Sequence, residues 1–180
     1  MLAFVLACVL AVPVLSLAAE PDPRPVPTDS TIFADHDYRF RLVRPPRFTV
    51  RRRTSTELHD FSPAPAAAVF FMNPNMASGD LAGIEPPDLE VRVYRAQGRG
   101  SLKSWLAQND VAYGDTGVRV SAYREGSVNG LEVCQSTLIA PGCSVYVRDG
   151  DRVYQLRAAT RDGERMLATF LPLPRSLDFR

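Results

Sequence analysis

The chain has 180 residues, of which 46% are apolar and 23% are charged, values that are ordinary for a globular protein. Its formal net charge is +1, so no overall positive field attracts nucleic acid, and we expect no nucleic-acid partner. Without its apolar leader and the proline-rich stretch that follows, the chain keeps about 150 residues, which is enough for one domain that needs no metal or disulfide in order to fold.

The first 19 residues form an apolar segment that predicts an exported protein, periplasmic or secreted. Pro13 interrupts the segment and the small residues Ser16 and Ala18 close it, so we expect a signal peptide over residues 1–19, cleaved after Ala18 or Ala19. No Lys or Arg precedes the apolar core; either the α-amine of Met1 supplies the usual charge, or the true start lies upstream. The alternative is an uncleaved N-terminal membrane anchor, which takes about 20 apolar residues.

A proline-rich linker follows the leader. Residues 20–30 begin with Glu-Pro-Asp-Pro-Arg-Pro-Val-Pro, a composition that predicts an extended, semi-rigid spacer. Within the leader, Cys8 ends a Val-Leu-Ala-Cys run that is similar to a lipoprotein acylation site. Few residues precede Cys8 and mostly apolar residues follow it, so we favour removal of this cysteine with the leader. A single domain is expected over residues 31–175.

The first half of that domain is predicted to consist of strands. Alternating side chains predict a half-buried strand over Asp37–Val43, and a second short strand follows over Phe48–Arg52. Val69–Met72 is an apolar run typical of a buried strand. Asn73–Pro87 contains three prolines and two glycines and therefore predicts a long loop.

The second half of the domain is predicted to contain five strands and two helices. Leu89–Tyr94 is an expected strand, and Leu102–Asn109 has helical periodicity with Ser101 as its N-terminal cap. Four antiparallel strands and a last helix are then expected: Val118–Arg124, Leu131–Ile139, Ser144–Arg148, Arg152–Ala158 and the helix Gly163–Phe170. Turn residues, Asn129-Gly130 among them, separate the strands. Strands grouped apart from helices predict an α+β fold, an antiparallel β-sheet flanked by helices.

Two cysteines remain once the leader is removed, Cys134 and Cys143. An even number in an oxidising compartment predicts a disulfide bond between them, closing a loop of about ten residues. A zinc site prefers C-x₂₋₄-C spacing with further Cys or His ligands, and a redox pair prefers C-x-x-C. The eight-residue gap fits neither alternative.

Three segments carry a resemblance to a known group. They are Tyr38–Leu42 with a later proline and Phe48, Leu89–Tyr94 with Trp105-Leu106, and Val153–Leu156 with Met166–Phe170. Together they resemble the PsbP/Mog1/DcrB-like domains. The resemblance implies a Mog1/PsbP-like sandwich, in which helices flank an antiparallel sheet. It also implies a binding or assembly role with no shared catalytic residues, so no site residue is carried over.

The two histidines, His36 and His59, are the candidates for an enzyme. Each stands in a small polar cluster: Asp35-His36-Asp37, and Glu57, His59 and Asp60. A strand would send His36 to the face opposite its two neighbours, which spoils the convergence that a metal needs. We therefore expect no metal and no cofactor. A metal-dependent or hydrolytic enzyme that uses His36 or His59 stays as the alternative function.

The loops offer two weaker candidates. Gly98–Ser101 precedes a helix and could hold an anion at its N-terminus, but it lacks the spacing and the lysine of a phosphate-binding loop. A capped loop is the simpler interpretation. A pocket under the Asn73–Pro87 loop would suit a small-ligand carrier, which is a further alternative function.

The strongest binding candidate in the sequence is the stretch from Arg39 to Arg53, which holds seven arginines and no acid. The residues proposed to bind are Arg44, Arg47, Arg51, Arg52 and Arg53. Arginine forks engage carboxylates and phosphates, so an envelope protein or an anionic surface is the expected partner. The alternative is a solvated strand face paired with acids elsewhere in the chain. The sequence therefore predicts an exported, non-catalytic binding or assembly module of the cell envelope.

Overall fold

The computed structural model describes residues 31–59, 62–74, 86–98, 100–109, 111, 117–136 and 142–174. The predicted signal peptide with Cys8, the linker, and positions 75–85 of the predicted Asn73–Pro87 loop lie outside the described residues. No helix in the described ranges is long and apolar enough to cross a membrane.

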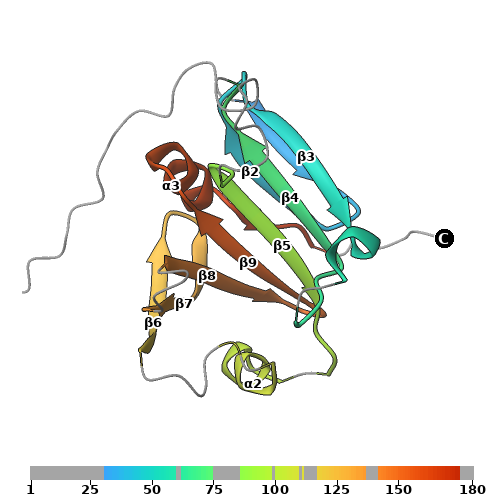
Figure 1. The fold of residues 1–180 in the computed structure, drawn as a ribbon, viewed down its shortest axis with the longest axis vertical. Coiled ribbons are helices and arrows are strands. Elements are labelled where there is room, and N and C mark those ends of the chain that lie inside the picture. The colour runs from blue at the N-terminus through green and yellow to red at the C-terminus, as the bar shows by residue number, and fades with distance from the viewer. Residues whose placement is uncertain are drawn as a thin grey trace, which may run out of the picture.

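The centre of the fold is an antiparallel sheet, to which the described residues contribute seven strands (Figure 1). In spatial order the strands are β3 (Thr49–Thr54), β4 (Ala67–Met72), β5 (Leu89–Arg95), β9 (Arg152–Ala158), β8 (Gly142–Asp149), β7 (Val128–Gln135) and β6 (Val118–Glu125). The strands β6 to β9 follow one another as a meander. The predicted fold class, an antiparallel sheet flanked by helices, is confirmed.

A second, smaller sheet and the last helix cover one face of the large sheet, which we call the α3 face. The small sheet contains β1 (Thr31–Asp35), β2 (Phe40–Arg44) and β10 (Leu171–Pro172), and the helix is α3 (Arg161–Ala168). Phe40 stacks on Phe170, with ring centroids 5.5 Å apart, and both rings contact Tyr154 of β9. These aromatic residues form the centre of the main hydrophobic core.

The start of α3 is tied to the start of β5. Thr160 caps the helix, because its Oγ1 accepts a hydrogen bond from the Gly163 backbone N–H at 3.2 Å. The same hydroxyl donates to Oδ1 of the buried Asp88 at 2.7 Å. Gly163 lies directly against the Asp88 carbonyl, so the helix and the strand are in backbone contact.

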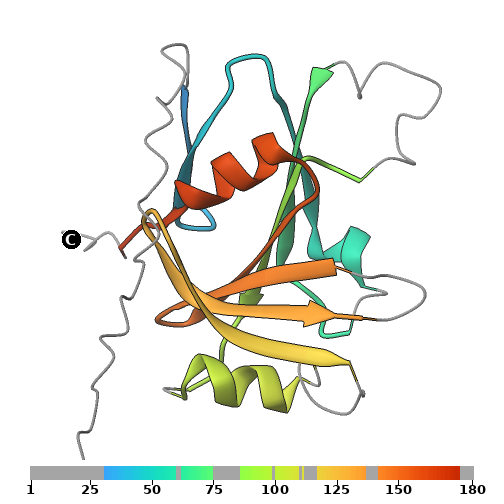
Figure 2. The ribbon, with the colours of Figure 1, turned by 90° about the vertical axis from the view of Figure 1, so that its left-hand side faces the viewer.

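The helix α2 (Leu102–Gln108) covers part of the opposite face, which we call the α2 face (Figure 2). Ser101 caps it as predicted, accepting a hydrogen bond from the Ser104 N–H at 3.1 Å. Trp105 packs on Tyr94 and Tyr146, and these residues belong to a second core cluster separate from the first. Because side chains alternate along a strand, β5, β9, β8 and β7 contribute to both clusters.

Several predicted boundaries are wrong in detail. The strand β1 is absent from the prediction, and the strand expected over Asp37–Val43 begins only at Phe40, after a turn in which Arg39 has a φ of 54°. The turn between these strands was expected to contain Gly126 and Asn129-Gly130. It does contain Gly126, with a φ of 56°, but Asn129-Gly130 lies inside β7. Gly130 is a glycine for another reason: a Cβ there would lie 2.1 Å from the Tyr146 carbonyl oxygen.

Candidate functional site

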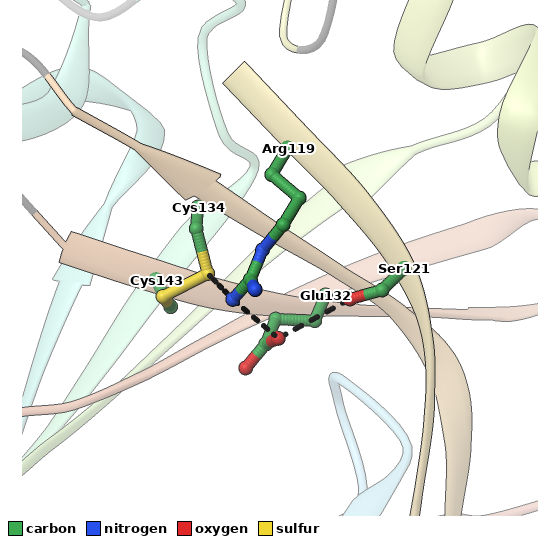
Figure 3. The surroundings of a disulfide bond; sticks show 5 residues. All are labelled: Arg119, Ser121, Glu132, Cys134 and Cys143. Atoms are coloured by element: carbon green, nitrogen blue, oxygen red, sulfur yellow. Dashed lines mark hydrogen bonds and ion pairs between the residues drawn. A yellow bond between two sulfur atoms is a disulfide. The ribbon is translucent and has the colours of Figure 1, made fainter. Parts of the chain in front are cut away.

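The predicted disulfide between Cys134 and Cys143 is confirmed. The two residues lie directly opposite each other in the β7–β8 ladder, and their sulfurs are 2.06 Å apart. The bond lies near the β6 edge of the sheet, on the α3 face, because Cys143 alternates in step with Val145 and Val147 of the main core. Figure 3 shows its surroundings. The disulfide fixes the register of β7 and β8 one residue from the last pair of their ladder, Gln135 and Gly142. Residues 137–141 lie outside the described residues.

Polar side chains from β6 and β7 surround the disulfide. Arg119 approaches the Cys134 sulfur at 3.6 Å and the Glu132 carboxylate at 3.9 Å, and Ser121 donates to the same carboxylate at 3.3 Å (Figure 3). Glu132 and the two cysteines form the one group in the described part of the chain that is close enough to share a metal ion. Disulfide sulfurs are not thiolates, however, so the oxidised protein offers no such site.

The two histidine clusters are spread out rather than gathered. Asp35 is buried and pairs with Arg52 at 3.0 Å, whereas His36 and Asp37 are exposed. In the second cluster, His59 is exposed and its Nδ1 lies 2.9 Å from the Thr56 carbonyl oxygen. Glu57 accepts a hydrogen bond from the Thr54 N–H at 2.9 Å and so caps the short 3₁₀ turn η1 (Ser55–Leu58). Asp60 lies outside the described residues.

The arginines proposed to bind are distributed over both faces of the sheet. Arg52 lies on the α3 face, where it pairs with Asp35, and strand alternation sends Arg51 and Arg53 to the α2 face. The Arg53 guanidinium lies over the Phe70 ring, 5.4 Å from its centroid. Arg44 belongs to the small sheet.

Three of the five proposed binding arginines have partners inside the protein. Arg44 donates to the Phe48 carbonyl at 2.7 Å and reaches two further carbonyls of the same turn. Arg52 and Arg53 have the carboxylate and aromatic contacts already described. Arg47 and Arg51 are exposed. The geometry therefore does not gather the segment into one continuous basic patch.

The loop before α2 is held by another arginine, Arg148 of β8. Its guanidinium donates to the Gly98 carbonyl at 2.7 Å and to the Ser101 carbonyl at 3.4 Å. Arg99 lies outside the described residues, and α2 has only seven residues. The carbonyl contacts agree with the simpler interpretation of Gly98–Ser101 as a capped loop.

A polar pocket lies beside α2 on the α2 face, and the sequence analysis missed it. Its volume is about 330 Å³, within the range of small-ligand sites. The floor comes from strands β5, β9, β8 and β7, and the rim comes from Ser62-Pro63 and the end of α2. We call it the sheet-face pocket. Its main polar lining residues are Arg92, Tyr94, Gln135, Ser144, Gln155 and Arg157.

A partly buried ion pair lies at one side of the pocket. Glu90 and Arg92 are two residues apart on β5, so both side chains point to the α2 face, and the Arg92 Nε lies 2.5 Å from the Glu90 carboxylate. Burial opposes the charge of Arg92, but the hydrogen bond and the charge of Glu90 outweigh that effect and raise the pKa of Arg92. The guanidinium therefore stays charged, with its carboxylate partner beside it.

A chain of hydrogen bonds crosses the pocket floor from β5 to β8. The Tyr94 hydroxyl donates to the Gln155 Oε1 at 2.8 Å, and the Gln155 Nε2 donates to the Ser144 Oγ at 3.2 Å. Burial raises the pKa of Tyr94 and of Tyr146, which also lines the pocket, so both phenols stay protonated near neutral pH. The polar groups of the floor are therefore ordered by the protein itself.

The rim links the pocket to α2. The Gln135 side-chain amide donates to the Val111 carbonyl at 3.5 Å, and Asn109 donates through its side chain to the Trp105 carbonyl at 2.8 Å. Trp105 in turn packs on Tyr94 and Tyr146. The helix and the polar floor therefore hold each other in place.

No family model matches the sequence, and no curated protein matches it. Among solved structures, the chain is similar to cyanobacterial PsbP (CyanoP) from Synechocystis sp. PCC 6803, determined in solution. The identity is 11% and the TM-score is 0.48, over 86% of this chain and 98% of that one. This similarity concerns the arrangement of the chain alone, and no family membership, ligand or partner follows from it.

Proposed function

We propose that this chain is an exported, non-catalytic binding module that takes a small polar ligand in the sheet-face pocket. The observation that carries the proposal is the ordered floor of the pocket, where Tyr94, Gln155 and Ser144 are joined by hydrogen bonds across three strands. Ligand sites are usually preformed concavities, and this pocket is one with a mostly polar lining, which suits a polar ligand.

The chemistry of the pocket supports binding rather than catalysis. Covalent catalysis needs a nucleophile beside a base, but the Ser144 hydroxyl accepts a hydrogen bond from an amide, which cannot take its proton. The tyrosines and Arg92 have raised pKa values and keep one protonation state near neutral pH. Neither His36 nor His59 is among the residues that line the pocket.

Export is supported by the disulfide. Bonds of this kind persist in oxidising compartments such as the periplasm or the extracellular space, and they are rare in the cytosol. The proposal therefore includes cleavage of the leader after Ala18 or Ala19. Mass spectrometry of the protein isolated from its own cells tests this point. A mature chain that begins at Ala19 or Glu20, with no alkylatable thiol, is expected, and an intact leader would contradict it.

The arginine segment supports the proposal less strongly, because Arg44, Arg52 and Arg53 have partners within the protein. An envelope protein or an anionic surface that binds the exposed Arg47 and Arg51 is a second proposal for the same module. The two sites lie on different parts of the sheet, so one experiment separates them.

That experiment is a screen of small polar molecules by two-dimensional ¹H–¹⁵N NMR on the oxidised, exported protein. The proposal predicts a binder that shifts the backbone amides of Gln135, Ser144 and Gln155 together. Ser144→Leu, which fills the pocket, should abolish those shifts, whereas Ser121→Leu on the opposite face should not. Shifts confined to residues 44–53, or none in the pocket with any molecule, would contradict the pocket as the binding site.

A further inference from the structure

The balance of charge in the sheet-face pocket is positive. Two guanidinium groups line it, those of Arg92 and Arg157. The Glu90 carboxylate is engaged by the Arg92 Nε and is itself not part of the lining. Glu90 also lies opposite Arg157 in the β5–β9 ladder, so the two arginines share one acid and one positive charge remains at the pocket.

The Arg157 guanidinium lines the sheet-face pocket, where a ligand can reach it. Arg157 is an exposed residue of β9, and no ion pair within the described ranges involves it. Its guanidinium lies over the backbone of Gly142: a Cβ at that position would meet the Arg157 Nη2 at 3.4 Å and its Nε at 3.9 Å. A glycine at position 142 thus leaves room for the guanidinium at the pocket wall.

Ser144 supplies a second donor next to Gly142. Its Oγ accepts the hydrogen bond from the Gln155 Nε2, and that amide is oriented by the Tyr94 hydroxyl. Because the Ser144 oxygen accepts this hydrogen bond, its hydroxyl proton can be donated to a ligand. Ser144 and Arg157 each lie one residue beyond the Val145–Leu156 pair of the β8–β9 ladder, so the two donors come from neighbouring strands.

We infer that the sheet-face pocket binds a small molecule bearing an oxyanion, a carboxylate or a phosphate, with Arg157 as its charged contact and the Ser144 hydroxyl as its second donor. This inference rests on the proposed function and names its ligand class. A planar arginine guanidinium binds two oxygens of a carboxylate or phosphate at once through charge-assisted hydrogen bonds. A neutral ligand forms weaker hydrogen bonds with the same group. The mostly polar lining and the volume of about 330 Å³ fit a small organic acid or phosphate compound rather than an acyl chain.

Calorimetric titration of the oxidised, exported protein tests the inference with three probes: malate, inorganic phosphate and the neutral diamide of malate. Binding of malate or phosphate is expected, with the diamide at least tenfold weaker. Arg157→Gln should weaken the oxyanion at least tenfold and Ser144→Ala severalfold. Arg119→Gln, which removes an exposed arginine on the opposite face, should leave the affinity unchanged. The emission of the single tryptophan, Trp105, checks that each variant is folded.

The outcomes distinguish an organic acid from a phosphate compound. They also distinguish failure of the oxyanion inference from failure of the proposed function. Preference for malate identifies an organic acid, and preference for phosphate identifies a phosphate compound. An Arg157→Gln variant that is folded and binds as tightly as the parent overturns the inference. If only neutral molecules shift the pocket amides in the NMR screen, the oxyanion inference fails while the proposed function stands. If no molecule shifts them, both fail.

Discussion

Replacing Gly163 by alanine should destabilise the protein, although alanine is the better helix former. In an exposed helix interior the change would add about 1 kcal/mol of stability. Here the new Cβ would lie 1.8 Å from the Asp88 carbonyl oxygen and 2.7 Å from its carbonyl carbon. Both neighbours are backbone atoms of the segment entering β5, so neither can turn aside as a side chain would.

The cost follows from the distance that α3 must move. A carbon and a carbonyl oxygen approach no closer than about 3.3 Å, so the helix must retreat from β5 by roughly 1.5 Å. Met166 and Leu167 then leave their packing on the core, where a gap of even 0.5–1 Å forfeits about a quarter to a half of each contact energy. Overpacking typically costs about 1–3 kcal/mol, and a clash with backbone belongs at the upper end. Less the roughly 1 kcal/mol that alanine adds as the better helix former, we expect a net loss of about 2 kcal/mol.

Urea unfolding followed by circular dichroism measures this loss. Gly100→Ala is the matched control, because the atoms nearest a Cβ at position 100 are 3.9 Å away, and its effect should be within about 0.5 kcal/mol. A Gly163→Ala variant as stable as the parent, or more stable, would refute the close approach of α3 to the start of β5.

Three other changes give measurable results. Replacing Cys134 and Cys143 by alanine should cost about 2–3 kcal/mol of unfolding free energy, and reductant should then have no effect; an unchanged urea midpoint would count against the bond. Trp105→Ala should cost about 3–5 kcal/mol by emptying the space between α2 and the sheet, with Trp105→Phe losing less in the same assay. Burial raises the pKa of Tyr154 to about 12, so the folded state favours the neutral phenol. Stability from this group is full below pH ~10 and is lost as the pH rises towards 12, which absorbance titration at alkaline pH checks; a titration midpoint near pH ~10 for this phenol in the folded protein would contradict it.

The sequence predicted most elements of the large sheet, because its central strands carry strong apolar patterns. Val69 and Val91 lie in the main core, and the meander was recognisable from its strands and turns. The small sheet was harder. β1 is short, mostly exposed and paired on one side only, so its residues carry little apolar signal. Gly130 looked like a turn residue because close backbone approach and tight turns favour the same amino acid.

Of the candidate site, the sequence predicted the disulfide but not the pocket. The disulfide was predictable because spacing and compartment left few alternatives for Cys134 and Cys143. The sheet-face pocket was not, since Arg92, Gln155 and Arg157 alternate with apolar residues, as solvated side chains of any half-buried strand do. Only the pairing of β5 with β9, which places residues more than 60 positions apart side by side, brings these groups together. The one available signal was Glu90 beside Arg92 in a strand otherwise typical of the core.

A crystal structure of the oxidised protein soaked with the tightest oxyanion probe tests the central claim most directly. The account predicts the probe in the sheet-face pocket, with one oxygen pair on the Arg157 guanidinium and another oxygen within hydrogen-bond distance of the Ser144 hydroxyl. A probe seated instead against Arg47 and Arg51, with the sheet-face pocket empty, would contradict the account and move the binding site to the arginine segment.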